Sequence, residues 1–355
     1  MRNIFSGFLF VCAILVLAVS CVEKDRYVTL SGYAQGGTYA VKINLKGVRR
    51  SPAEIGAHVD SLLKEIDRSL SGYNRNSILS RFNAGEKVVP DSLFIDIYSR
   101  AYEIYRLTGT CVDPSSAPLF DLWGFGFTTD SLPSSDEVAK VLERCGMDRL
   151  KVDIAGAVAS DGTLSSQDLL GDSVSSDVPE LNYNAIAQGY SCDVVAQYLY
   201  SIGVRDMMVD IGEIFCDGVN PSGRPWTIGI DRPADGNNTP GADIQEVFHV
   251  PAGPHGVVTS GNYRKFYVRD GRKYAHTIDP RTGYPVDHNL LSATVTAPDA
   301  TLADAFATYC MVIGLEEAKE FISSVPELEA CLIYDEDGQM KSWCSTGFVL
   351  ATLQR

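Results

Sequence analysis

Two Asp-Gly dipeptides, at residues 270–271 and 337–338, each separate two runs of aromatic and aliphatic residues. Such a dipeptide is typical of the tight turn between antiparallel strands, because both of its residues tolerate the positive φ that the turn requires. Further strand-like runs at residues 207–214, 226–230 and 292–296 alternate irregularly with helical patterns, and we find no repeat of fixed period. We therefore predict an α+β fold with a mixed or antiparallel sheet and flanking helices.

The first helical pattern begins at a clear signal. Residues 51–54 (Ser-Pro-Ala-Glu) form a capping box with Pro at the first helical position. Apolar residues then recur at helical spacing, which predicts an amphipathic helix over residues 52–70. With 355 residues and 45% hydrophobic content, the chain can bury a sizeable core, and no clean boundary divides it. We expect a single large domain over residues 27–355.

The net charge of −15 argues against one broad class of ligand. Binding to a nucleic acid depends on stripes of Lys and Arg that meet the phosphate backbone, and the sequence shows none. We therefore expect no nucleic-acid partner. An acidic protein that handles a phosphorylated ligand needs backbone amides or a metal ion to hold the phosphates.

The N-terminal residues have the pattern of an export signal. Arg2 precedes an apolar run over residues 4–19, which ends in small residues before Cys21 and is too short for a comfortable membrane span. The pattern resembles bacterial lipoprotein signals, in which that cysteine is lipidated and becomes the first residue. We predict a signal peptide over residues 1–20, lipidation of Cys21 and a tether over residues 21–26, the alternative being a plain cleaved signal. Lipidation implies an anchor on the periplasmic side of a membrane of the bacterial cell envelope.

Nine cysteines are present, and two of them lie in the signal region. The remaining seven are an odd number and include no Cys-x-x-Cys pair, so the sequence shows neither a zinc site nor a disulfide framework. Most of them have apolar neighbours and are expected to be small buried hydrophobic residues.

Residues 274–283 (Tyr-Ala-His-Thr-Ile-Asp-Pro-Arg-Thr-Gly) place a histidine and a carboxylate beside a turn. His276 has the side chain best suited to move protons near neutral pH, and Asp279 can orient it or bind a cation. The alternative is a histidine whose hydrogen bonds are satisfied within the core. The spacing of the five histidines argues against a zinc site.

A second polar pair lies in the apolar run of residues 301–308. In a helix Asp304 and Thr308 share one face, and a carboxylate beside a hydroxyl suits a hard cation that prefers oxygen ligands. Burying an unpaired Asp among small apolar residues is costly, and a metal ion would offset that cost. The alternative is an exposed Asp and a Thr bonded to its own helix, and the residues alone leave both interpretations open.

Other catalytic and nucleotide-binding patterns are weak. Ser260 in Thr-Ser-Gly lacks the Gly-x-Ser-x-Gly surroundings of a serine hydrolase. The glycines at residues 36–37 belong neither to a phosphate loop nor to a Rossmann fingerprint. A dinucleotide, if bound, is therefore not held by a Rossmann fold.

Six segments resemble, in the same order, segments of the ApbE family, the FAD:protein FMN transferases, over nearly all of the chain that follows the signal region. The most specific are residues 274–283, which match His-x-Ile-Asp-Pro-x-Thr-Gly, and residues 303–308, which match Ala-Asp-Ala-x-Ala-Thr. The resemblance implies the ApbE-like form of an α+β fold. The remaining segments are residues 34–39, 71–83, 111–113 with 122–125, and 257–263.

A seventh segment departs from the family pattern. The family's Asp-Leu-Gly-Ala-Ile-Ala-Lys-Gly is Asn-Tyr-Asn-Ala-Ile-Ala-Gln-Gly here, at residues 182–189. Asn182 and Gln188 replace a carboxylate and a lysine, which keeps the hydrogen-bonding capacity but removes charge from two expected contacts with the flavin nucleotide. The backbone carbonyl of Ala185, which the resemblance makes a metal ligand, is unaffected.

The resemblance implies a Mg²⁺ site and an FAD site. Mg²⁺ would be held by Asp304, Thr308 and the Ala185 carbonyl, and would bridge the FAD pyrophosphate. His276 would act on the acceptor hydroxyl or on the transferring phosphate, with Asp279 in support. The residues expected to line the FAD site are Gln35, Tyr73, Cys111, Val112, Asp113, Asn182, Gln188 and Ile278.

The same resemblance implies an enzyme that joins the FMN part of FAD to a Thr or Ser hydroxyl of an acceptor protein and releases AMP. FAD is then a substrate, Mg²⁺ the cofactor, and the acceptor a flavin-carrying subunit of a redox complex. Two alternatives stay open. One is hydrolysis of FAD to FMN and AMP, and the other is a flavin-binding lipoprotein without catalysis, which the charge loss at Asn182 and Gln188 keeps in view.

Overall fold

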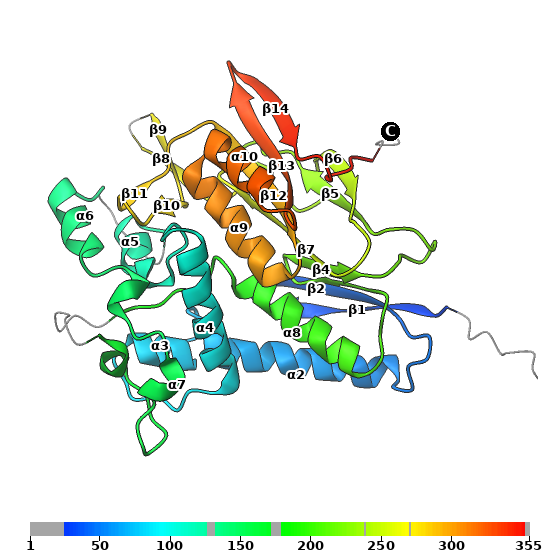
Figure 1. Ribbon diagram of the computed structural model, residues 1–355, viewed down its shortest axis with the longest axis horizontal. Coiled ribbons are helices and arrows are strands. Elements are labelled where there is room, and N and C mark those ends of the chain that lie inside the picture. Colours follow the sequence, from blue (N-terminus) through cyan, green and yellow to red (C-terminus); the bar gives the residue numbers. More distant parts are fainter. Residues whose placement is uncertain (1–24, 126–131, 172–178, 238, 270, 352–355) are drawn as a thin grey trace, which may run out of the picture.

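One antiparallel eight-stranded sheet forms the centre of the molecule, in the order β1-β2-β3-β4-β7-β12-β13-β14 (Figure 1). The expected α+β fold is therefore confirmed, with an antiparallel sheet. The computed structural model describes residues 25–125, 132–171, 179–237, 239–269 and 271–351. The strands of the sheet are β1 (Tyr27–Ala34), β2 (Gly37–Asn44), β3 (Met207–Asp210), β4 (Ile214–Asp217), β7 (His255–Gly261), β12 (Leu290–Ala297), β13 (Glu329–Glu336) and β14 (Gln339–Cys344).

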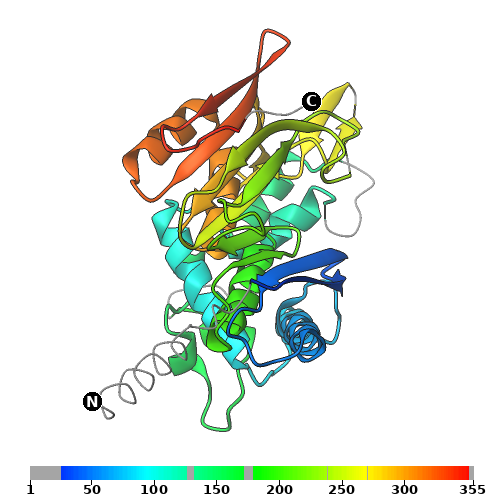
Figure 2. The same cartoon turned by 90° about the vertical axis from the view of Figure 1, so that its right-hand side faces the viewer.

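Helices cover one face of this sheet. α8 (Ala187–Ser201) and α9 (Ala300–Ile313) lie side by side, α8 against β3 and β4 and α9 against β7 and β12 (Figure 1). α2 (Pro52–Leu70) packs against β1, α8 and α4 (Ser92–Leu107), and Figure 2 shows it nearly end-on beside β1 and β2. The other helices are α3 (Ile78–Asn83), α5 (Ala117–Leu122), α6 (Ser135–Leu142), α7 (Ile154–Ala157) and α10 (Leu315–Ser324), with 3-10 turns at Pro114–Ser116, Met147–Arg149 and Ser166–Leu169.

The sheet is buried on both faces near β13. Successive side chains of a strand point to opposite faces, and Leu332 packs with the helices whereas Cys331 and Ile333 pack on the other side. There they meet the hairpin formed by β5 (Thr227–Asp231) and β6 (Ile244–His249). Phe248 of β6 belongs to the hydrophobic cluster on this second face of the sheet.

Local signals in the sequence are confirmed where they are strongest. α2 spans residues 52–70, and the Glu54 carboxylate accepts from the Ser51 backbone N–H at 2.8 Å while the Ser51 hydroxyl accepts from the Glu54 N–H. The two predicted hairpins are β8 (Phe266–Arg269) with β9 (Arg272–Ala275), and β13 with β14.

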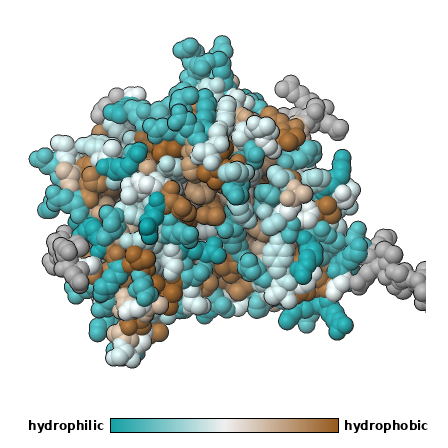
Figure 3. Space-filling view, viewed as in Figure 1, coloured by the Kyte–Doolittle hydropathy of each residue, from teal (hydrophilic) through white to brown (hydrophobic). Residues whose placement is uncertain are grey.

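The predicted export signal lies outside the described residues, as do Cys21 and all but the last two residues of the predicted tether. β1 begins at Tyr27, directly after that tether. Among the described helices, none combines the length and the apolar character needed to cross a bilayer. The face of the molecule in Figure 3 is mostly hydrophilic, with apolar side chains gathered near its middle.

A close approach between α8 and α9 positions the site. A Cβ atom at Gly189 would lie 2.1 Å from the Ala300 carbonyl oxygen and 3.0 Å from the Asp304 Cβ, so a side chain there would push the helices apart. Asp193 of α8 also accepts hydrogen bonds from the backbone N–H groups of Ala300 and Thr301, at 2.9 Å each. The start of α9 is thereby held against the first turns of α8.

Candidate active site

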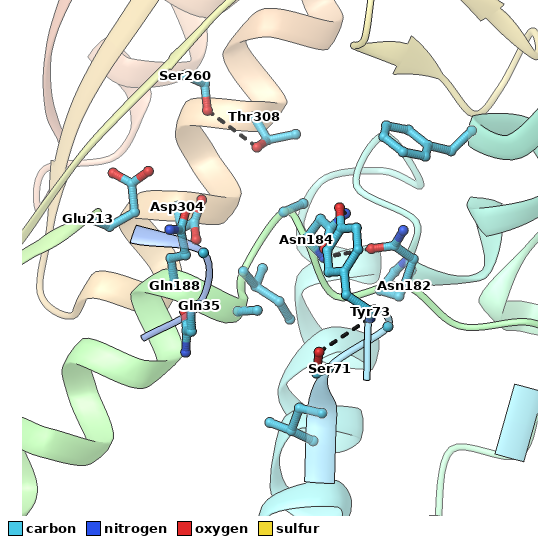
Figure 4. A pocket seen from close by; sticks show the side chains of 18 of the residues that line it. Gln35, Ser71, Tyr73, Asn182, Asn184, Gln188, Glu213, Ser260, Asp304 and Thr308 are labelled. Atoms are coloured by element: carbon cyan, nitrogen blue, oxygen red, sulfur yellow. Dashed lines mark hydrogen bonds between the residues drawn. The ribbon is translucent and has the colours of Figure 1, made fainter. Parts of the chain in front are cut away.

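A single large pocket of about 1360 Å³ contains nearly all of the residues singled out in the sequence. It lies between the β1–β2 turn, the end of α2, the segment before α8, the end of β7, the short strand β10 (Ile278–Asp279) and α9. Figure 4 shows part of its lining. The predicted residues that line it are Gln35, Tyr73, Cys111, Val112, Asp113, Asn182, Ala185, Gln188, His276, Ile278, Asp304 and Thr308.

Two carboxyl groups meet at one end of the pocket (Figure 4). Asp304 on α9 is only 5% exposed, and its Oδ2 accepts a hydrogen bond from the Gly189 N–H at 3.1 Å. Burial raises the pKa of Asp304 to about 8. Burial also raises the pKa of Glu213 well above its ordinary value, and the nearby Asp304 charge raises it further. Two desolvated acids side by side favour a positive partner between them.

Further oxygen donors adjoin this acidic end. Thr308 lies one helical turn after Asp304, and its Oγ1 is 3.4 Å from the Ser260 Oγ at the end of β7 (Figure 4). Ala185 also lines the pocket. A carboxylate, a hydroxyl and a backbone carbonyl are the donor types that a hard divalent cation prefers. Within the described residues no group of three His, Cys, Asp or Glu side chains could hold a metal ion.

His276 faces the pocket in a defined tautomer. Its Nδ1 lies 3.0 Å from the Lys265 carbonyl oxygen, and because a carbonyl only accepts, Nδ1 carries the proton and Nε2 of the neutral ring is left as an acceptor. Burial lowers the pKa of His276, against the opposing effect of that hydrogen bond. The ring is therefore neutral at pH 7 and can accept a proton at Nε2.

The structure pairs Asp279 with Arg281 and His276 with the Lys265 carbonyl. Asp279 does not line the pocket but pairs with the guanidinium of Arg281, at 2.8 Å from Oδ2 to Nη2 and 3.0 Å from Oδ1 to Nε. It also accepts from the Arg281 backbone N–H at 2.9 Å. Arg281 is only two residues away and closes the turn, so it takes the carboxylate that the sequence assigned to His276.

The opposite end of the pocket is built from amides and an aromatic ring (Figure 4). Tyr73 is 63% exposed at the rim, and its hydroxyl accepts from the Asn184 side-chain amide at 3.4 Å. The Asn182 side-chain oxygen accepts from the Asn184 N–H at 2.8 Å, so Asn182 closes its own turn. This end offers a flat ring and uncharged hydrogen-bonding groups.

Two glutamines that line the pocket also form hydrogen bonds to neighbouring elements of the fold. Gln188 donates to the Ile211 carbonyl at 3.2 Å, and Gly212 leaves the room for it, because a Cβ there would lie 2.4 Å from the Gln188 Nε2. Gln35, in the β1–β2 turn, donates to the Ser191 hydroxyl on α8. Both side chains are engaged in holding neighbouring elements together, although both also line the pocket.

The segment from Cys111 to Asp113 forms a third wall. The Asp113 carboxylate caps a 3-10 turn by accepting from the Ser115 N–H at 2.9 Å, and it accepts from the Gly146 N–H at 3.0 Å. Burial raises the pKa of Asp113 to about 6 and raises the pKa of the Cys111 thiol. A neutral thiol and a carboxylate bound to the backbone fit a structural lining rather than a nucleophile.

The pocket is also lined by residues that were given no role from the sequence, among them Glu213, Ser260, Arg264 and Lys265. Glu213 directly follows Gly212 in the tight turn between two strands, where the backbone conformation fixes the direction of a side chain. Ser260 lies in the segment of residues 257–263 that resembles the family, and its contact with Thr308 places it at the site. Arg264 and Lys265 give the lining positive charge in an acidic protein, and their signal is their position just after the Thr-Ser-Gly end of β7.

The fold and this pocket define an α+β protein with a ligand-sized cavity between an oxygen-rich acidic end and an aromatic rim. The ApbE family model matches residues 35–332, and the chain belongs to the ApbE family. It is 32% identical to the FAD:protein FMN transferase of Vibrio cholerae serotype O1, covering 98% of each chain. It is 32% identical to that of Escherichia coli K12, covering 90% of this chain and 87% of the relative.

Solved structures agree with this assignment. The flavin transferase ApbE from Vibrio cholerae has a TM-score of 0.73 at 30% identity, over 92% of this chain and 99% of the other. The apo form of the Pseudomonas stutzeri flavinyl transferase ApbE has a TM-score of 0.75 at 26% identity, over 92% of this chain and 96% of the other. The similarity therefore spans the whole described domain.

Proposed function

We propose that the chain transfers the FMN part of FAD to a Thr or Ser hydroxyl of an acceptor protein and releases AMP. The observation that carries this proposal is the single pocket, in which the acidic end, the His276 ring and the expected flavin-lining residues come together in a member of the ApbE family. The relatives named as FAD:protein FMN transferases support it over nearly their full length.

The acidic end fits a divalent cation. Asp304 is buried beside Glu213 with a strongly raised pKa, and a cation would favour its charged form. We assign the Mg²⁺ ligands to Asp304, Thr308 and the Ala185 carbonyl, as the family resemblance implies. When bound, Mg²⁺ would polarise the phosphoryl oxygens and stabilise the charge of the departing AMP. Arg264 and Lys265 also line the pocket and would supply further positive charge for the pyrophosphate.

Proton transfer falls to His276. Its Nδ1 proton is held by the Lys265 carbonyl, which leaves Nε2 to accept the proton of the acceptor hydroxyl as the new phosphoester forms. The exposed Tyr73 ring offers a surface for the flat flavin at the rim, where the acceptor chain has access. Asn182 and Gln188 then provide hydrogen bonds without the charge that other family members carry.

One incubation tests the proposal against its alternatives. The mature chain is mixed with FAD, Mg²⁺ and a candidate flavin-carrier domain, and the acceptor is analysed by intact-mass spectrometry while AMP is measured by chromatography. We expect the acceptor to gain a phosphoester-linked FMN and an equal amount of AMP to appear. An acceptor whose target Thr is replaced by Val, and a sample with EDTA, serve as controls.

The other outcomes of that incubation decide among the remaining functions. AMP without an acceptor adduct would identify hydrolysis of FAD to FMN and AMP. Binding of FAD with neither product would leave only a flavin-binding role and would overturn both enzymatic proposals.

We also propose that the chain is a lipoprotein of the cell envelope, with residues 1–20 removed and Cys21 lipidated, and with residues 27–355 as the catalytic domain. The basic start, the short apolar run and the small residues before Cys21 support this placement. Cells fed an alkyne fatty acid should label the chain, and Cys21→Ser should abolish the label. Persistent labelling of Cys21→Ser would contradict lipidation at this residue.

A further inference from the structure

Two cysteines face each other across the last hairpin of the sheet. Cys331 of β13 is the register partner of Cys344 of β14, and β14 is the edge strand. Figure 1 shows this hairpin extending away from the helices. Cys331 is fully buried, whereas Cys344 is partly exposed.

The backbone bonds around this pair show which type of cross-strand pair it is. The Ser345 N–H donates to the Ala330 carbonyl at 2.9 Å, so the bonded residues flank the cysteines on one side. The two cysteines therefore occupy a non-hydrogen-bonded position of the antiparallel ladder. Opposed Cα atoms at such positions are about 4.5 Å apart and the side chains lie close together, which falls within the range of about 4.4–6.8 Å that a disulfide spans.

The two thiols are close enough to influence each other's protonation. The neighbouring Cys344 raises the pKa of Cys331, and the neighbouring Cys331 lowers the pKa of Cys344. The more exposed of the two sulfurs is thus the one with the greater thiolate character. For the other five cysteines of the described chain, burial raises the pKa of the thiol. These are Cys111, Cys145, Cys192, Cys216 and Cys310.

We propose that Cys331 and Cys344 are a site of disulfide formation, which closes when the chain meets a disulfide oxidant. The Cys344 thiolate attacks one sulfur of the oxidant, forms a mixed disulfide and releases the first oxidant thiol. The Cys331 sulfur gives up its proton and attacks the Cys344 sulfur, which releases the second thiol. Two protein thiols thus lose two electrons and two protons, and the oxidant disulfide gains them.

The bond would stabilise the edge of the sheet without touching the pocket. No residue of β13 or β14 is among the described residues that line the cavity. A cross-link between β13 and β14 constrains the unfolded chain and holds the edge strand in register. The proposal is therefore independent of flavin transfer, and its failure would leave the proposed function intact.

The test compares the mature chain after treatment with oxidised glutathione and with dithiothreitol. Free thiols are then alkylated, and the non-reduced digest is analysed by mass spectrometry. We expect a peptide that joins Cys331 to Cys344, and a melting temperature roughly 5 °C higher in the oxidised sample. In Cys344→Ser, both the joined peptide and the shift should be lost.

Cys145→Ser is the matched control, because Cys145 is also partly exposed and its thiol donates to the Val141 carbonyl at 3.5 Å, which a serine hydroxyl can replace. We expect this variant to form the cross-link as the wild type does. The proposal would be overturned if both Cys331 and Cys344 were alkylated after oxidation and the oxidised sample melted at the same temperature as the reduced one. A shift that persists in Cys344→Ser would overturn it as well.

Discussion

Asp304→Asn is expected to lower the rate of FMN transfer about a thousandfold, because a metal ion contributes several kcal/mol of charge stabilisation in the transition state. The Asn side chain keeps the shape of Asp and can still accept the hydrogen bond from the Gly189 N–H. The variant therefore removes the charged ligand from the acidic end with little change in the packing of α8 against α9. The activity is measured as AMP release with FAD and an acceptor at saturating concentrations.

The melting temperature of the same variant with and without Mg²⁺ shows whether activity is lost because the metal no longer binds or because the fold is damaged. Mg²⁺ should raise the melting temperature of the wild type without FAD, and should leave that of Asp304→Asn unchanged. Because the pKa of Asp304 without metal is about 8, protons compete with Mg²⁺ below that pH, so the affinity should rise as the pH approaches 8.

Glu317→Gln is the control for this experiment, because Glu317 is an exposed carboxylate near the start of α10. It should match the wild type in both the rate and the Mg²⁺-dependent melting temperature. Wild-type turnover in Asp304→Asn would refute the metal assignment.

Local features of the fold could be predicted because their causes lie within a few residues. The helix at residues 52–70 begins where Ser51 and Glu54 cap each other, and the last hairpin turns at residues 337–338, where Asp337 adopts a φ of 54°. A residue pattern contains these effects directly. The order of eight strands in one sheet follows only from long-range pairing, and the sequence predicted no more than the class of sheet.

The candidate site was predicted as a set of residues but not as a set of contacts. The helical spacing of Asp304 and Thr308 placed them on one face, yet it left open whether Asp304 is exposed. Its burial comes from the packing of α8 at Gly189, more than 100 positions away in the sequence. Glu213 was missed for the same reason, since the influence of Asp304 on it exists only after the sheet and the helices have packed.

The partner of Asp279 in the structure is decided by competition between neighbouring groups. Asp279 lies three residues after His276, so the sequence allowed a contact with the ring. Arg281 is only two residues away, is always charged and offers two parallel N–H donors to the carboxylate. The pairing of Cys331 with Cys344 was not drawn from the sequence, although the two-residue turn at Asp337 and Gly338 sets this register. Contacts between elements thus remain the part that a single sequence does not determine.

His276→Ala is expected to reduce FMN transfer by about 10²- to 10⁴-fold, which is the usual contribution of a positioned general base. In the wild type, burial lowers the pKa of His276 below its ordinary 6.5. The neutral, proton-accepting form therefore persists below that pH, and the rate should fall only when the ring is protonated in more acidic solution. His276→Ala should lose this acid limb of the pH profile along with most of its rate.

Asp279→Asn provides the matched comparison for the His276 prediction. Because Asp279 pairs with Arg281 and the Nδ1 of His276 bonds to the Lys265 carbonyl, the acid limb should stay at its wild-type pH in this variant. If Asp279 did stabilise the protonated ring, its removal would lower the pKa of His276 and move the limb to lower pH. Mg²⁺ must be saturating at every pH, so that protonation of Asp304 adds no limb of its own. A His276→Ala variant that keeps the wild-type limb would show that another group accepts the proton from the acceptor hydroxyl.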